Sequence, residues 1–145
     1  MARFMMESSL PVLAVPNSGL DKKVGENILV AWDASAEAAR AVHDAMPFLL
    51  AAKDVTIVSI TEGRKQRSPT ADICTMLARL GVNARGVDEE EHHDRAAILL
   101  DLADKWNTDL IVAGAWGHKR LLEVIFGGVT KTLFTNQKIA IFFSH

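Results

Sequence analysis

The sequence contains a single cysteine, Cys74, among its 145 residues. One cysteine excludes an internal disulfide and a cysteine-based zinc site. No apolar run approaches the roughly 18 residues that a membrane span requires. The N-terminus also lacks the basic start, apolar stretch and small-residue cleavage pattern of a signal peptide. We therefore predict a cytoplasmic protein without a membrane segment, in which Cys74 is buried and inert on the apolar side of a helix.

The chain has no excess of charge of either sign, since its net charge is −2 and its pI is about 6.2. This balance gives no electrostatic argument for nucleic-acid binding. The basic run at residues 64–67 is predicted to be a solvated loop rather than a binding patch.

Recognisable catalytic and metal-binding patterns are also missing. His92 and His93 have no further ligands at a metal-binding spacing, so we predict a solvated turn and no metal site. No serine–histidine–acid or paired-carboxylate arrangement stands out, and no catalytic residue is predicted. Nor does the first strand of the main domain lead into the GxGxxG loop of a dinucleotide-binding fold.

What the chain does have is apolar residues, which make up 49% of it and are enough for one packed domain. Apolar runs predict strands over 28–32, 55–60, 82–87, 110–113 and 139–143. Helical stripes predict a helix through about residue 51 that is kinked at Pro47, and helices over about 94–106 and 128–135. A further helix is expected to start with Ser68 as its N-cap and to end at Gly81, and the acidic residues 88–91 are expected to form a turn.

Strands that alternate with helices predict an α/β fold with an open parallel sheet and helices on both faces. A flavodoxin-like or Rossmann-like order, 3-2-1-4-5, suits the five strands and places a topological switch point between the first and the fourth. Ligands bind beyond the carboxyl ends of the strands at such a point. Trp32, Asp33 and the loop Gly114–Gly117 fall there.

The loop after the fourth strand is rich in glycine. It begins Gly114-Ala115-Trp116-Gly117 and is followed, nine residues later, by Gly127-Gly128-Val129-Thr130, where a helix is expected to begin. Glycine allows a ligand to approach the backbone closely, and amides at a helix start favour anions. We therefore predict a nucleotide or phosphate site. Its candidate residues are Trp32, Asp33, Gly114, Ala115, Trp116, Gly117, Arg120, Gly127, Gly128, Val129 and Thr130.

Several of these residues have a simpler explanation that stays open. Asp33 could cap the following helix instead of contacting a base or ribose. Gly114 and Gly117 could serve a tight turn that needs positive φ, and Arg120 could simply be solvated. Trp116 could fill the cleft itself instead of covering a ligand.

The first 19 residues form a separate segment, in which residues 10–15 resemble a strand and residues 16–19 a linker. When residues 2–16 are set beside residues 131–145, Leu10 falls on Ile139, Val12 on Ile141 and Leu13 on Phe142. This similarity suggests a remnant of an internal repeat, although any short apolar strand resembles another. We expect this strand to be ordered and to bury Leu10, Val12 and Leu13 beside the last strand.

Residues 26–145 resemble the universal stress protein family. Residues 28–35 are similar to its opening strand, and Asp109 to Gly117 to its D-L-I-V-x-G-x-x-G stretch. The spacing to Gly127 is similar to the family's motif, glycine-x2-glycine-x9-glycine-serine/threonine. Residues 1–19 look like the last strand and linker of a preceding domain, since many members are tandem fusions.

The resemblance implies a stress-response protein that binds ATP or AMP and acts as a sensor or adaptor. Bound ATP would be accompanied by Mg, and any ATPase activity would be weak at most. It also implies a homodimer or pseudo-dimer through the terminal strands. Gly128 stands where the motif has serine or threonine, and this departure favours an alternative, a ligand-free dimerisation or interaction domain. A related ATP-pyrophosphatase would need an SGGxDS-like loop, which residues 31–35 do not provide.

Overall fold

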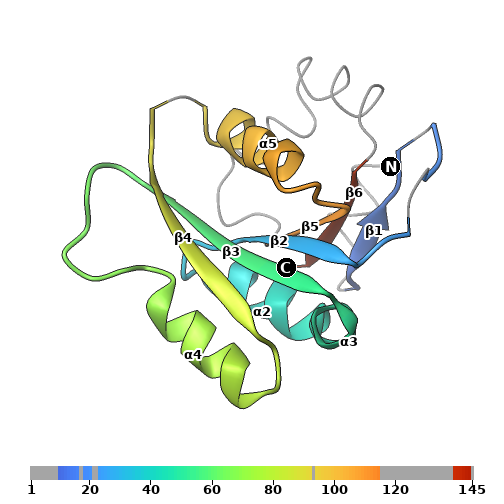
Figure 1. Ribbon diagram of the computed structural model, residues 1–145, viewed down its shortest axis with the longest axis horizontal. Coiled ribbons are helices and arrows are strands. Elements are labelled where there is room, and N and C mark those ends of the chain that lie inside the picture. Colours follow the sequence, from blue (N-terminus) through green and yellow to red (C-terminus); the bar gives the residue numbers. More distant parts are fainter. Residues whose placement is uncertain (1–9, 17, 21–22, 93, 115–138, 145) are drawn as a thin grey trace.

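The computed structural model describes residues 10–16, 18–20, 23–92, 94–114 and 139–144. Its sheet has six strands in the order β1-β6-β5-β2-β3-β4 (Figure 1). The bounds are β1 Val12–Ala14, β2 Asn27–Ala31, β3 Asp54–Thr61, β4 Ala84–Glu90, β5 Leu110–Gly114 and β6 Ala140–Ser144. The strands β2 to β6 pair in parallel and follow the predicted order 3-2-1-4-5, whereas β1 adds a sixth, antiparallel strand beside β6.

Helices cover both faces of the sheet, as predicted. Figure 1 shows α2 (Ala36–Asp44), α3 (Met46–Ala51) and α4 (Ala71–Arg79) on one face and α5 (Arg95–Lys105) on the other. Successive β2 residues face opposite sides, so that Ile28 and Val30 pack towards α2 and Leu29 packs towards α5. A strand with helices packed on both faces of its sheet has no side that faces solvent, which explains the unbroken apolar run of β2. None of the described helices is long and apolar enough to cross a bilayer.

The predicted kinked helix is in fact two helices, α2 and α3, which meet at Ala45. Proline lacks an amide hydrogen and its ring clashes with the carbonyl four residues earlier, so Pro47 cannot continue α2. It is instead accommodated in the first turn of α3, where a missing amide donor costs nothing.

The start of α4 also differs from the prediction. Thr70, not Ser68, occupies the N-cap position, and the Ser68 hydroxyl instead donates to the carboxylate of Asp88 on β4. The Thr70 hydroxyl donates to the same carboxylate at 3.0 Å. A Cβ on Gly86 would lie 2.3 Å from the Thr70 hydroxyl oxygen, so glycine lets this segment lie directly on β4.

The acidic residues predicted as a turn are largely part of β4, which pairs with β3 as far as Glu90 opposite Thr61. Strand β4 ends the described sheet, and charged side chains are tolerated there because they reach water. Cys74, beside β4, is half-buried rather than buried. Burial, followed by the nearby charge of Asp88, raises the pKa of its thiol.

The N-terminal strand is ordered, but one expectation about it is wrong. Leu10 and Leu13 are 70% and 42% exposed, and only Val12 of the three is partly buried. Alternate residues of a strand face opposite sides, and one side of β1 keeps much of its surface in water. The side that packs inward carries Ala14, which lies against the cluster containing Ile141 and Phe143.

Candidate functional site

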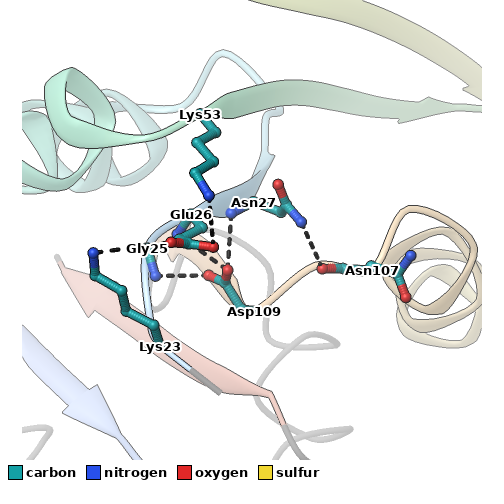
Figure 2. Close-up of polar contacts among 7 residues, drawn as sticks. All are labelled: Lys23, Gly25, Glu26, Asn27, Lys53, Asn107 and Asp109. Carbon is teal, nitrogen blue, oxygen red and sulfur yellow. Dashed lines mark hydrogen bonds and ion pairs between the residues drawn. The ribbon is translucent and has the colours of Figure 1, made fainter.

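A buried carboxylate, Asp109, joins the amino ends of the two central strands. It is 7% exposed and accepts hydrogen bonds from the backbone amides of Gly25 (2.6 Å), Glu26 (3.0 Å) and Asn27 (2.9 Å). Figure 2 shows these bonds together with the exposed ion pairs of Glu26. Three amide donors satisfy a buried charge. Asp109 is thus a structural clamp that aligns β2 with β5, a role that its place in the glycine-rich stretch did not reveal.

A cavity opens at the other, carboxyl, end of the same strands. Its space, including the open mouth, is about 480 Å³. This volume includes open solvent, and the enclosed part is only about 40 Å³, so the position of the cavity, and not its size, is the argument for a ligand site. The cavity is lined by residues of β2, the turn from β2 to α2, the first turn of α2, β3, β5 and the first half of α5, namely Ala31, Trp32, Asp33, Ser35, Ala38, Val58, Ile60, Arg95, Leu99, Ala113 and Gly114. The cavity therefore lies at the topological switch point, where ligands bind in open α/β sheets.

Polar groups at the mouth come from the turn between β2 and α2. The Asp33 carboxylate accepts from the amide of Ser35 at 2.9 Å, and the Ser35 hydroxyl accepts from the amide of Ala38 at 3.1 Å. Between them Ala34 has φ +60°, a conformation that costs a non-glycine residue roughly 1–2 kcal/mol. Ser35 is thus the helix cap, while Asp33 shapes the turn and also lines the cavity.

Trp32 is fixed by its backbone and its ring. Its amide donates to the carbonyl of Val58 at 2.8 Å, which continues the pairing of β2 with β3. Its side chain is half-buried against the cluster beneath α2, α3 and α4. Trp32 also lines the cavity, but its ring packs on the opposite face of the sheet from Val58 and Leu99, and its binding role stays a prediction.

Glycine is required at residue 114 for a steric reason that differs from both predicted ones, ligand approach and a tight turn. A Cβ at this position would lie 2.6 Å from the amide nitrogen of Ala38 and 2.6 Å from the carbonyl carbon of Glu37. These are backbone atoms, which cannot move aside cheaply. Gly114 is therefore needed for the close contact of β5 with the first turn of α2, whether or not a ligand is present.

The sequence prediction missed a charged pair at the α5 side of the cavity. Nε and Nη2 of Arg95 donate to one carboxylate oxygen of Glu91 at 3.1 and 3.0 Å. The side chains of Arg95 and Glu91 are only 24% and 21% exposed. Arg95 lines the cavity beside Leu99, and it begins the helix that Asp94 caps. A cation at the start of a helix is unusual, and this was the sequence signal that could have drawn attention to Arg95.

Eight of the predicted site residues lie outside the residues that the structure describes. They are Ala115, Trp116, Gly117, Arg120, Gly127, Gly128, Val129 and Thr130. The other three predicted site residues, Trp32, Asp33 and Gly114, all line the cavity. Within the described ranges, no group of three histidine, cysteine, aspartate or glutamate side chains is placed to hold a metal ion.

Comparison with known proteins gives a family and a set of related folds. The model of the universal stress protein family matches residues 64–142, more than half of the chain. No curated protein sequence matches significantly.

Three solved structures illustrate the similarity of fold. A universal stress protein from Archaeoglobus fulgidus DSM 4304 superposes with a TM-score of 0.69 at 17% identity, covering 95% of this chain and 50% of that one. A universal stress protein family member from Burkholderia pseudomallei gives 0.56 at 20% identity, covering 72% and 91%. A universal stress protein in complex with cAMP gives 0.57 at 18% identity, covering 83% and 97%. This chain therefore spans half the length of the Archaeoglobus fulgidus protein.

Proposed function

The chain belongs to the universal stress protein family, and from this premise we propose that it binds an adenine nucleotide, ATP or AMP, as a stress-response sensor or adaptor. The observation that carries the proposal is the position of the cavity, at the carboxyl ends of β2 and β5 where the strand order reverses. The cAMP complex of a protein with a similar fold supports a nucleotide as the ligand class.

The chemistry of the described lining suits the base and ribose. Val58, Ile60 and Leu99 are apolar lining residues that would contact a planar ring. The carboxylate of Asp33, at the mouth, would accept from a base amino group or a ribose hydroxyl. The phosphates, with Mg²⁺ in the case of ATP, would lie towards the glycine-rich residues that follow Gly114 in the sequence.

We propose binding rather than dedicated catalysis. Among the described lining residues Asp33 is the only carboxylate, and its oxygen already accepts from the amide of Ser35. A carboxylate used to hold a turn is a poor general base. Hydrolysis of bound ATP is therefore expected to be slow at most.

The decisive experiment measures nucleotide in the protein as purified, followed by calorimetric titration with ATP, AMP and cAMP. We expect adenine nucleotide at about one per chain, or saturable binding of one of the three. Gly117→Val should abolish this binding, because β-branched side chains hinder a close backbone approach. A folded, nucleotide-free protein that binds none of the three would contradict the proposal, and unchanged affinity in Gly117→Val would contradict the placement.

Restoring the hydroxyl of the family motif gives a second test. Gly128→Ser should strengthen ATP binding by about 1–2 kcal/mol, as expected of a hydrogen bond to a charged phosphate. Gly63→Ser, in the exposed loop after β3, is the matched control and should leave the affinity unchanged. Equal affinities in all three proteins would show that the missing hydroxyl does not limit binding.

A ligand-free interaction domain is the second candidate, and one observation favours it. Gly114 is explained by its contact with α2, so this part of the glycine pattern would persist without a ligand. The titrations above separate the two candidates, because only the first predicts saturable nucleotide binding.

We also propose that β1 and β6 form a pseudo-dimeric seam within one chain. Leu13 pairs with Phe142, Val12 with Phe143 and Ala14 with Ile141. Under the repeat alignment, Val12 corresponds to Ile141 and Ala14 to Phe143, so the register is symmetric about the Leu13–Phe142 pair. Two copies of one strand related by a two-fold axis would pair in this way.

A further inference from the structure

Arg95 occupies a position that is unfavourable for a cation. It is the first residue of α5, where amides without helical partners and the helix dipole create positive potential. Its side chain is only 24% exposed, so it also loses much of its hydration. Local features that oppose stability tend to occur at functional sites.

Glu91 holds this guanidinium in a defined orientation. The two hydrogen bonds from Nε and Nη2 of Arg95 reach the same Glu91 oxygen at 3.1 and 3.0 Å and fix the guanidinium plane relative to the end of β4. These bonds use two of the five N–H groups of an arginine. The guanidinium therefore has three further N–H groups and two flat faces, and Arg95 lines the cavity.

The lining around Arg95 suits a ring better than a phosphate. Leu99 from the same helix and Val58 and Ile60 from β3 are apolar, and Ala31 and Ala113 are small. The Glu91 carboxylate also neutralises the charge that a phosphate would seek. A guanidinium that is already paired retains its planar faces, which stack on aromatic rings.

We propose that Arg95, oriented by Glu91, contacts the base of the bound nucleotide and is a specificity-determining residue of the cavity. This inference rests on the proposed function. Arg95 would cover the planar base from the α5 side, while β3 and β5 supply the opposite, apolar surface. A ligand without a planar base would leave the guanidinium without its contact.

The test compares ATP with adenosine, which has the base but no phosphate, by calorimetry on the full chain. Arg95→Ala should weaken the binding of both ligands by the same factor, about tenfold. Arg95→Lys keeps the charge but lacks the planar guanidinium, so it should also weaken both ligands equally. Arg85→Ala is the matched control, since Arg85 lies over Trp106 at the other end of α5, outside the cavity lining, and should leave both affinities unchanged.

Each other outcome overturns the inference. Loss confined to ATP would mean that Arg95 contacts phosphate, and unchanged affinities in both Arg95 variants would mean that it contacts no ligand. If the unaltered chain binds neither ATP nor adenosine, the proposed function itself fails, which distinguishes that failure from an error about Arg95. Arg95→Lys retains the cation for Glu91, so it supplies the comparison even if Arg95→Ala fails to fold.

Discussion

The Asp109 carboxylate uses both of its oxygens to accept backbone amides, so the residue cannot be replaced by its amide without loss. Asp109→Asn would turn an NH2 group towards the amide donors of Gly25, Glu26 or Asn27. We expect a loss of about 2–4 kcal/mol in the free energy of unfolding, because buried donors lose charged partners. Urea denaturation measures this value.

Asp101→Asn is the control for that substitution, because Asp101 is an exposed residue of α5. It should change the free energy of unfolding by less than about 0.5 kcal/mol. Equal losses in the two variants would show that the Asp109 clamp contributes nothing beyond an ordinary surface carboxylate.

Single residues of the site were predictable where topology determines their place. Trp32, Asp33 and Gly114 follow directly from strands, so their meeting at one edge follows from the strand order. Arg95 was not predictable in this way, because its contact with the cavity depends on how α5 crosses the sheet. The steric need for Gly114 was equally hidden, since it depends on the distance between β5 and α2.

Gly114 also determines how closely a helix and a strand can approach. Gly114→Ala would place a Cβ against the backbone of Glu37 and Ala38, and α2 would have to shift. We expect a loss of about 2–3 kcal/mol in the free energy of unfolding, as for other overpacked interiors. The measurement is urea denaturation without nucleotide.

A glycine in open space provides the comparison for this variant. Gly63 has φ +72° and no atom within 4 Å of an added Cβ, so Gly63→Ala meets only left-handed strain, about 1 kcal/mol. If Gly114→Ala were no more destabilising than Gly63→Ala, close packing would not be the reason for glycine at residue 114.

The link between β6 and α2 gives the fold a dependence on pH. The buried Ser144 hydroxyl donates to the carboxylate of Asp44 and is the main cause that lowers the pKa of Asp44 below 3.8. Burial opposes this shift, whereas His43 and Arg40 add to it. A carboxyl whose pKa is lowered by folding stabilises the fold above its unfolded value, and the effect disappears as the pH falls through the folded value.

Ser144→Ala should therefore destabilise the protein most at neutral pH. The difference from the unaltered chain should begin to narrow as the pH falls below about 3.8, where the unfolded carboxyl takes up a proton, and should close as the pH falls through the lower folded pKa of Asp44. Urea denaturation at pH 7 and pH 3 tests this, with the exposed Ser18→Ala as control. A difference independent of pH would contradict the role of Asp44.

Elements were predicted well where the signal is local. The buried strands are recognisable in the sequence as apolar runs. The predicted helix start at Asp94 agrees with its place as the N-cap of α5. The interruption between α2 and α3 was underestimated because the apolar stripe continues across Pro47. Strand β4 was predicted over 82–87 and in fact runs from Ala84 to Glu90, because its acidic half is stabilised by pairing with β3, a long-range contact that local preference cannot reveal.

At the scale of the whole molecule, the alternation of strands and helices predicted the class and the strand order, because right-handed crossovers leave few topologies. The pairing of β1 with β6 was expected from the repeat. The partial exposure of β1 was not expected. The burial of an edge strand depends on which segments pack beside it, and the pattern of a short strand does not carry that information.

Removal of residues 1–16 should expose the edge of β6, whose residues Ala140 to Ser144 are all buried. An uncovered apolar edge invites pairing with another chain. We expect aggregation or a change of oligomeric state in sedimentation and light scattering. Removal of residues 1–9, which keeps β1, is the control and should retain the original state. A 1–16 deletion that sediments like the full chain would defeat the proposed seam.

The two outer strands of the described sheet differ in chemistry, and this difference limits how copies could assemble. Strand β4 carries Asp88, Glu89 and Glu90, so two copies would repel each other along that side. Strand β1 is short and apolar, with Leu13 exposed. A sheet with two receptive sides could add copies without end and grow into fibres. Since the described sheet has only one such side, association through β1 would be limited to a closed pair.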